Sequence, residues 1–251
     1  DIQDASHKIM NSKTFDNATS CSSENSIIVL ESVYESMIES LIKEGGSLLN
    51  DAEKSKLQAT MWNDKGIINR DVIAKKSNEI AILAGLSEKH SSSKFLMVEE
   101  QNVGPKHPFS MEKLSPVLTV YRAQNFDHAV RIASSILENQ GKGHSCGIHS
   151  QDENNILQLG MELPVCRIIV NQAHCFATGG NFDNGLPFSL SMGCGTWGNN
   201  VTDENLNYKN YLNTTKIVKT IEINQPTEKD LFANYWKKYS LEHATVTELI
   251  D

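Results

Sequence analysis

Short apolar runs alternate with longer amphipathic stretches along most of this chain, and this alternation restricts its fold more than any other feature. Residues 26–30 read SIIVL, a length and composition typical of a buried strand. The next stretch places apolar residues every three or four positions, which is the pattern of a helix with one buried face. Strands that alternate with helices favour a parallel sheet with crossover helices, so we predict an α/β protein.

The same two periodicities predict the remaining elements. We expect strands at residues 26–30, 95–98, 116–121, 146–149, 166–170 and 216–221. One helix should start at a capping box formed by Ser32 and Glu35 and stop at Gly45 and Gly46. Further helices are expected at residues 51–61, 71–84, 127–139, 153–163 and 228–239. Residues 177–200 contain six glycines and few charges, and an ordered loop of this length is usually functional.

Composition excludes several classes of function. The formal net charge is −8 and no cluster of Lys and Arg is present, so neither nucleic acid nor an anionic membrane is an expected partner. No apolar run approaches the roughly 20 residues that span a bilayer. The five cysteines are odd in number and form no CxxC pair, which argues against a disulfide framework and against a metal site. Free thiols are typical of a reducing compartment, so we expect a cytoplasmic protein.

Cys21 is the first candidate for chemistry, because it lies in a small polar segment just before the strand at residues 26–30. Loops at strand ends favour catalytic groups, and backbone N–H groups there can stabilise a thiolate or an oxyanion. The alternative is an inert, half-buried cysteine. The run KTFDNATSCSSENSIIVLESVY resembles the nucleophile segment of CoA-acylating aldehyde dehydrogenases, with Asn25 where Gln is common. This resemblance implies that Cys21 is the nucleophile.

Three further segments resemble the same family in the same order. MEKLSPV at residues 111–117 is similar to its E-x-F-G-P-V element, which implies that Glu112 holds the nicotinamide ribose and that Pro116 belongs to the cofactor site. GKGHSCGIH at residues 141–149 is similar to its G-x-G-H-[ST] element, and RIIVNQ followed by GCGTWG is similar to its closing motifs. An exposed, solvated carboxylate is the alternative for Glu112.

Residues near these motifs suggest further roles around the thiol. An imidazole at His144 would handle the proton of the incoming CoA thiol, although a histidine bonded to the backbone is the alternative. His174, Thr196 and Trp197 are the candidates for the substrate pocket, while Trp197 could instead be a packing anchor.

The function implied is NAD- or NADP-dependent oxidation of a small-molecule aldehyde to an acyl-CoA, through a thiohemiacetal and a thioester on the cysteine, with coenzyme A as cosubstrate. Residues 174–185 resemble the subfamilies that act on sulfoacetaldehyde or succinate semialdehyde. Both aldehydes are anionic, so a cation or a group of N–H donors should line the pocket. Arg167 is one candidate, and a structural role is its alternative.

The family places its cofactor domain before the catalytic cysteine, whereas twenty residues precede Cys21 here. We therefore expect a partial chain: a remnant of the cofactor domain at 1–15, a three-layer catalytic domain at 16–188, and a glycine-rich segment and tail at 189–251. The full-length protein should be a homo-oligomer. Two other readings stay open, namely a non-acylating aldehyde dehydrogenase and an inactive fragment that acts only in binding or oligomerisation.

Overall fold

The computed structural model describes residues 1–239, and the chain forms two compact units, Asp1–Tyr211 and Leu212–Asp251. The first unit contains both sheets and seven of the eight α-helices of the described residues. Seven 3-10 helices complete these elements: η1 Phe15–Ala18, η2 Glu31–Val33, η3 Arg70–Val72, η4 Glu88–His90, η5 Pro108–Ser110, η6 Thr196–Gly198 and η7 Tyr208–Tyr211.

Four parallel strands form the central sheet of the first unit. Their order is β1 (Ser26–Leu30), β4 (Val117–Ala123), β3 (Phe95–Glu99) and β2 (Gly46–Leu48). Every pair in this sheet is parallel, as the alternation of strands and helices predicted. The α/β prediction is therefore confirmed.

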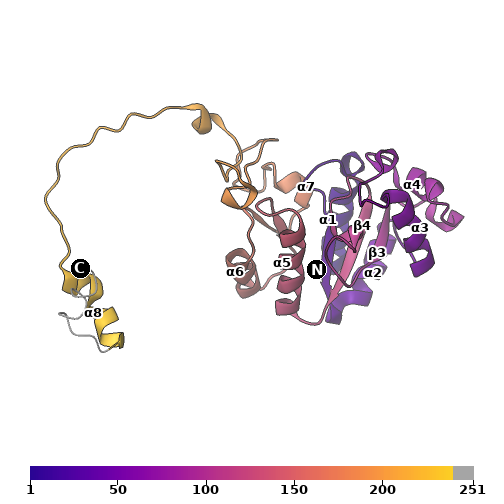
Figure 1. Ribbon diagram of the computed structural model, residues 1–251, viewed down its shortest axis with the longest axis horizontal. Helices are drawn as coiled ribbons and strands as arrows, with labels where there is room; N and C mark the ends of the chain where they lie inside the picture. The colour runs from indigo at the N-terminus through magenta and orange to yellow at the C-terminus, as the bar shows by residue number, and fades with distance from the viewer. Residues whose placement is uncertain (240–251) are drawn as a thin grey trace. The chain divides into compact units, whose positions relative to one another are not determined.

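Helices cover both faces of this sheet. Phe95 and Met97 of β3 pack with helices α1 (Ile2–Thr14) and α2 (Tyr34–Lys43). Leu96 and Val98 point to the opposite face, because side chains alternate along a strand, and lie in a second core with residues of α3 (Asp51–Met61) and α4 (Ser77–Leu83). Figure 1 shows these helices around β3 and β4. The result is a three-layer arrangement.

A second, two-stranded parallel sheet carries part of the candidate site. It pairs β5 (Cys146–Ile148) with β6 (Ile168–Val170), and α5 (Phe126–Asn139) and α6 (Glu153–Glu162) pack beside it. Ile28 of β1 packs against the same apolar cluster, so this cluster joins the two sheets. Helix α7 (His174–Ala177) follows β6.

Three expectations about secondary structure were wrong. Residues 71–84 do not form one helix, since Ala74 adopts a left-handed φ of 60° and separates η3 from α4. The Ser32–Glu35 capping box does not form, because Ser32 lies inside η2 and Val33 is the N-cap of α2; the Glu35 carboxylate instead accepts a hydrogen bond from Arg122 at 2.7 Å. Residues 216–221 do not form a strand, because no neighbouring strand pairs with them within the described residues.

Helix α8 (Glu228–Tyr239) is the regular element of the described part of the second unit, and its bounds match the prediction. None of the helices within residues 1–239 has the length and apolar character needed to cross a membrane.

Candidate active site

An unusual turn presents Cys21 to solvent. After α1 ends, Asp16, Asn17 and Ala18 adopt successive left-handed φ values of 47°, 50° and 61°. Each such residue costs on the order of 1 kcal/mol when it is not glycine, so the surrounding structure must hold the turn. Asn17 Nδ2 donates to the carbonyl of Ala74 at 3.1 Å, and the Thr19 hydroxyl donates to Asp16 Oδ2 at 2.6 Å. Cys21 follows three residues after this strained turn, and its thiol is exposed.

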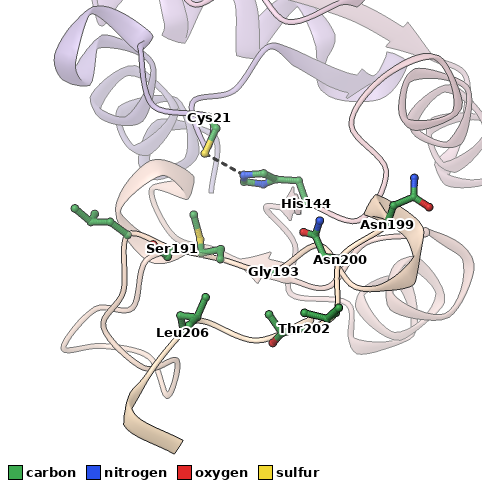
Figure 2. A pocket seen from close by; sticks show the side chains of 11 residues that line it. Cys21, His144, Ser191, Gly193, Asn199, Asn200, Thr202 and Leu206 are labelled. Carbon is green, nitrogen blue, oxygen red and sulfur yellow. Dashed lines mark hydrogen bonds between the residues drawn. The ribbon is translucent and has the colours of Figure 1, made fainter. Parts of the chain in front are cut away.

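His144 faces this thiol from the turn before β5. Its Nε2 lies 3.2 Å from Cys21 Sγ, as the dashed line in Figure 2 marks. Burial lowers the pKa of His144 below its ordinary value, and the charge of Arg167 adds to the effect. The imidazole is therefore neutral at pH 7 and can accept a proton from sulfur.

A glycine brings the His144 turn against the glycine-rich segment. Gly143 has a φ of 87°, and a Cβ built on it would lie 2.1 Å from the carbonyl oxygen of Cys194. No other residue type fits this approach without moving the backbone. The two segments that the sequence motifs singled out, residues 141–149 and 193–198, therefore touch each other.

His144 also bonds away from the thiol. Its Nδ1 lies 2.7 Å from Ser145 Oγ, and the same hydroxyl lies 2.7 Å from Nε2 of His174. His174 begins α7 and is buried. Burial lowers the pKa of His174 to about 3, so this imidazole is uncharged at neutral pH. A continuous row of hydrogen-bonding groups thus runs from Cys21 into the interior.

A cavity of about 630 Å³ opens beside Cys21 and His144. Its other walls come from the glycine-rich segment and the residues that follow: Leu190, Ser191, Met192, Gly193, Asn199, Asn200, Val201, Thr202 and Leu206. Figure 2 shows Ser191, Gly193, Asn200 and Thr202 of this wall across from Cys21 and His144. This segment folds back on itself, because Gly193 N–H donates to Glu204 and Leu206 N–H donates to Ser191, both at 2.9 Å.

Arg167 stabilises this folded-back segment through hydrogen bonds. The buried guanidinium donates from Nε to Asn205 Oδ1 at 2.8 Å, from one terminal nitrogen to the Gly193 carbonyl at 2.9 Å, and from the other to the Asp203 carbonyl at 3.3 Å. Its N–H groups are thus committed to the protein. The geometry supports the structural alternative for Arg167 and places it behind the cavity wall.

The structure brings some of the predicted site residues together and leaves others apart. Cys21 and His144 line one cavity, whereas Glu112, Pro116, His174 and the η6 residues Thr196 and Trp197 are not among its lining residues in the described chain. Glu112 lies at the exposed turn before β4, where its backbone N–H donates to Gln140 Oε1 at 2.9 Å. Pro116 is buried, and Trp197 is half exposed.

Sequence reasoning missed Ser145 and the polar residues of the far wall. Ser145 stood beside His144 in a quoted motif, but no pattern in the sequence indicated that its hydroxyl would bridge two histidines. Asn199 and Asn200 lay in the glycine-rich segment, whose composition was the available signal. Within residues 1–239, no group of three or more His, Cys, Asp or Glu side chains is placed to hold a metal ion.

Comparison with known proteins identifies the family of this chain. The model of the aldehyde dehydrogenase family matches residues 1–189. The chain therefore belongs to the aldehyde dehydrogenase family.

Its relatives include acylating enzymes. It is 52% identical, over 94% of its length, to a "Sulfoacetaldehyde dehydrogenase (acylating)" of Cupriavidus necator, of which it covers 48%. It is 35% identical, over 86% of its length, to a "Succinate-semialdehyde dehydrogenase (acetylating)" of Clostridium kluyveri, of which it also covers 48%. A crystal structure of an acetylating aldehyde dehydrogenase from Geobacillus thermoglucosidasius superposes with a TM-score of 0.83 at 35% identity, over 90% of this chain and 50% of that one. The chain thus spans about half the length of the curated relatives it matches.

Proposed function

We propose that this chain carries the acyl-transfer site of a CoA-acylating aldehyde dehydrogenase, with Cys21 as nucleophile and His144 as general base. The observation that carries the proposal is the 3.2 Å contact between Cys21 Sγ and His144 Nε2 at the mouth of the cavity. A thiol paired with a neutral imidazole is the arrangement that activates cysteine nucleophiles. The acylating relatives support the reaction class.

The chain's own groups account for the bond changes at sulfur. His144 Nε2 takes the thiol proton as Cys21 sulfur bonds to the aldehyde carbon, which gives a thiohemiacetal. No acceptor is found for the backbone N–H of Cys21 within residues 1–239, so this group is available to the oxyanion. Loss of hydride leaves a thioester on Cys21. His144 then releases its proton to solvent and takes the proton of the CoA thiol as the CoA sulfur bonds to the acyl carbon. The Cys21 sulfur leaves and regains that proton from His144.

NAD(P)+ would supply the hydride acceptor when bound, and Glu112 fits the part of this cofactor that the resemblance assigns to it. The Glu112 carboxylate is exposed and makes no hydrogen bond or ion pair within the described residues. A free carboxylate can accept hydrogen bonds from both hydroxyls of a ribose. Pro116 lies on the same turn and would shape the approach of the ribose to Glu112.

We propose a small anionic aldehyde as substrate, with sulfoacetaldehyde first and succinate semialdehyde second. The 52% identity to a sulfoacetaldehyde dehydrogenase supports this order. Within the described chain no Lys or Arg lines the cavity, but Ser191, Asn199, Asn200 and Thr202 offer hydroxyl and amide groups. Several neutral donors can together bind a sulfonate or carboxylate without a paired cation.

The test uses the full-length protein with sulfoacetaldehyde, NAD+ or NADP+, and CoA. We expect reduced cofactor and acyl-CoA to form in equal amounts, with acyl-CoA identified by mass spectrometry. Cys21→Ala should abolish both products, whereas Cys166→Ala, which changes a thiol outside the cavity, should retain them. Free acid formed equally fast without CoA would contradict acyl transfer to CoA. A preference for succinate semialdehyde or acetaldehyde would contradict the substrate order.

A further inference from the structure

The row of groups behind the Cys21–His144 pair has a defined order. Cys21 Sγ meets His144 Nε2 at 3.2 Å, His144 Nδ1 meets Ser145 Oγ at 2.7 Å, and Ser145 Oγ meets His174 Nε2 at 2.7 Å. Cys21 lies at the cavity, and His174 lies in the interior. The proposed chemistry uses the first two groups and leaves the last two without a role.

The number of hydrogens on each group determines which atom donates and which accepts in each hydrogen bond of this row. When His144 has taken the thiol proton, both of its ring nitrogens carry hydrogen, so Nδ1–H needs an acceptor. Ser145 Oγ can accept only if its own hydrogen points elsewhere. The neutral Nε2 of His174 is the acceptor at 2.7 Å, and this places the hydrogen of His174 on Nδ1. Because burial lowers the pKa of His174 to about 3, His174 stays an acceptor and does not take the proton away.

We propose that Ser145 and His174 are positioning residues that hold His144 with its Nε2 lone pair toward Cys21 and stabilise its protonated form. This inference rests on the proposed roles of Cys21 and His144. Without an acceptor at His174, the Ser145 hydroxyl is free to donate to His144 Nδ1. The imidazole hydrogen would then lie on Nε2, where it blocks proton transfer from sulfur.

The packing around His174 fixes the position of its imidazole, so that the ring can accept the hydrogen bond from Ser145. A Cβ on Gly147 of β5 would lie 2.8 Å from His174 Nδ1, so glycine at that position leaves room for the imidazole. The start of α7 is anchored as well, because Cys175 N–H donates to Ser12 Oγ at 2.8 Å and the Glu24 carboxylate faces the N–H of His174.

Two titratable neighbours also favour a neutral His174. His144 and His149 both act to lower its pKa, after burial, which is the larger cause. Glu24 faces the backbone N–H of His174, and burial raises the pKa of this carboxyl to about 7. Arg167 lowers the pKa of His144, and its guanidinium donates to the His144 carbonyl at 3.4 Å. His174 therefore remains the neutral end of the row at physiological pH.

The test is the rate at which iodoacetamide alkylates Cys21 in the 251-residue chain at pH 7, followed by mass spectrometry of the Cys21 peptide. Alkylation needs no aldehyde, CoA or cofactor. His144→Ala should slow it by about a hundredfold and Ser145→Ala by about tenfold, as expected for loss of a base and of one hydrogen bond to its charged form. Ser145→Thr keeps the hydroxyl and should react at close to the parent rate.

A double-mutant cycle separates positioning from general damage. In a His144→Ala background, Ser145→Ala should cause no further loss, because its effect passes through the imidazole. His174→Phe fills the same space without an acceptor and should behave as Ser145→Ala does. Cys146, whose pKa burial raises to about 11, should stay unlabelled in every folded variant.

Several results would overturn the inference. One is a Ser145→Ala or His174→Phe variant that reacts at the parent rate while His144→Ala is slow. Another is an equal loss with and without His144. If His144→Ala itself reacts at the parent rate, the proposed general base fails and the positioning role fails with it. If the cycle behaves as expected but the full-length protein forms no acyl-CoA, the proposed function fails and the positioning role stands.

Discussion

Cys21 Sγ and His144 Nε2 lie 3.2 Å apart although the two residues are 123 positions apart in the chain. Two features bring them together. The strained turn at residues 16–18 turns Cys21 toward solvent, and Gly143 lets the His144 turn press against Cys194. Each feature can be changed without touching the thiol or the imidazole, so the geometry can be tested apart from the chemistry.

Gly143→Ala should separate the two turns. The new Cβ would collide with the Cys194 carbonyl at 2.1 Å and would also occupy a left-handed backbone. Gly66→Ala is the matched control, since Gly66 has a φ of 72° but nothing within 4 Å of its added Cβ. Urea unfolding should show a loss of about 1 kcal/mol for Gly66→Ala and at least about 3 kcal/mol for Gly143→Ala. Equal losses of stability in the two variants would mean that the close approach of Gly143 to Cys194 does not contribute to the free energy of unfolding.

Arg167→Met should destabilise the first unit by about 3 kcal/mol, because it leaves the buried acceptors on Asn205, Gly193 and Asp203 without their donor. Arg131 on α5 is exposed, and Arg131→Met should change the free energy of unfolding by less than about 0.5 kcal/mol. Denaturant unfolding of both variants measures the difference. A small effect at Arg167 would return it to the list of candidate substrate-binding cations.

His174 should make the chain sensitive to acid. Its pKa is about 3 in the folded chain and 6.5 when unfolded, so below pH 6.5 the unfolded state binds the extra proton. The stability that His174 contributes is complete above pH 6.5 and should fall by about 1.4 kcal/mol per pH unit as pH drops toward 3. His174→Gln should remove this slope, while His128→Gln, at a half-buried position on α5, should keep it. Parallel pH profiles for parent and His174→Gln would contradict the neutral, buried imidazole.

Glu112→Gln in the full-length protein should slow turnover about ten- to a hundredfold while leaving the KM for aldehyde unchanged, because the proposed contact orients the nicotinamide ribose. Glu39→Gln, at an exposed site on α2, is the control and should have no effect. Steady-state kinetics with varied aldehyde and varied cofactor measure both parameters. Unchanged turnover and unchanged cofactor affinity would make Glu112 a solvated surface residue.

Local signals in the sequence predicted the elements that have their own stop and start residues. Helix α3 begins where expected because Asn50 and Glu53 form a reciprocal capping box. The strand predicted at residues 216–221 failed for a nonlocal reason, since a segment rich in β-branched residues forms a strand only beside a partner. The order of the strands in the sheet could not be predicted from the sequence either, because β1 pairs with β4 across about 90 residues of chain.

The residues of the candidate site also fall into those that local sequence signals indicated and those that depend on tertiary packing. Cys21 and His144 stand in motifs that resemble a known family, so the sequence alone was enough to propose them as site residues. The contact between Ser145 and His174 joins residues that are 29 positions apart, and it depends on how β5 and α7 pack. Composition could suggest that the glycine-rich segment was functional, but the approach of Cys194 to Gly143 is set by tertiary packing.

The most direct test of the central claim is the mass of the Cys21 peptide after the full-length protein has reacted with sulfoacetaldehyde and NAD(P)+ in the absence of CoA. We predict a mass increase that corresponds to the acyl group, confined to Cys21, and its complete loss on addition of CoA with release of one equivalent of acyl-CoA. An unmodified Cys21, or an acyl group on another cysteine that CoA discharges at the rate of turnover, would contradict the account.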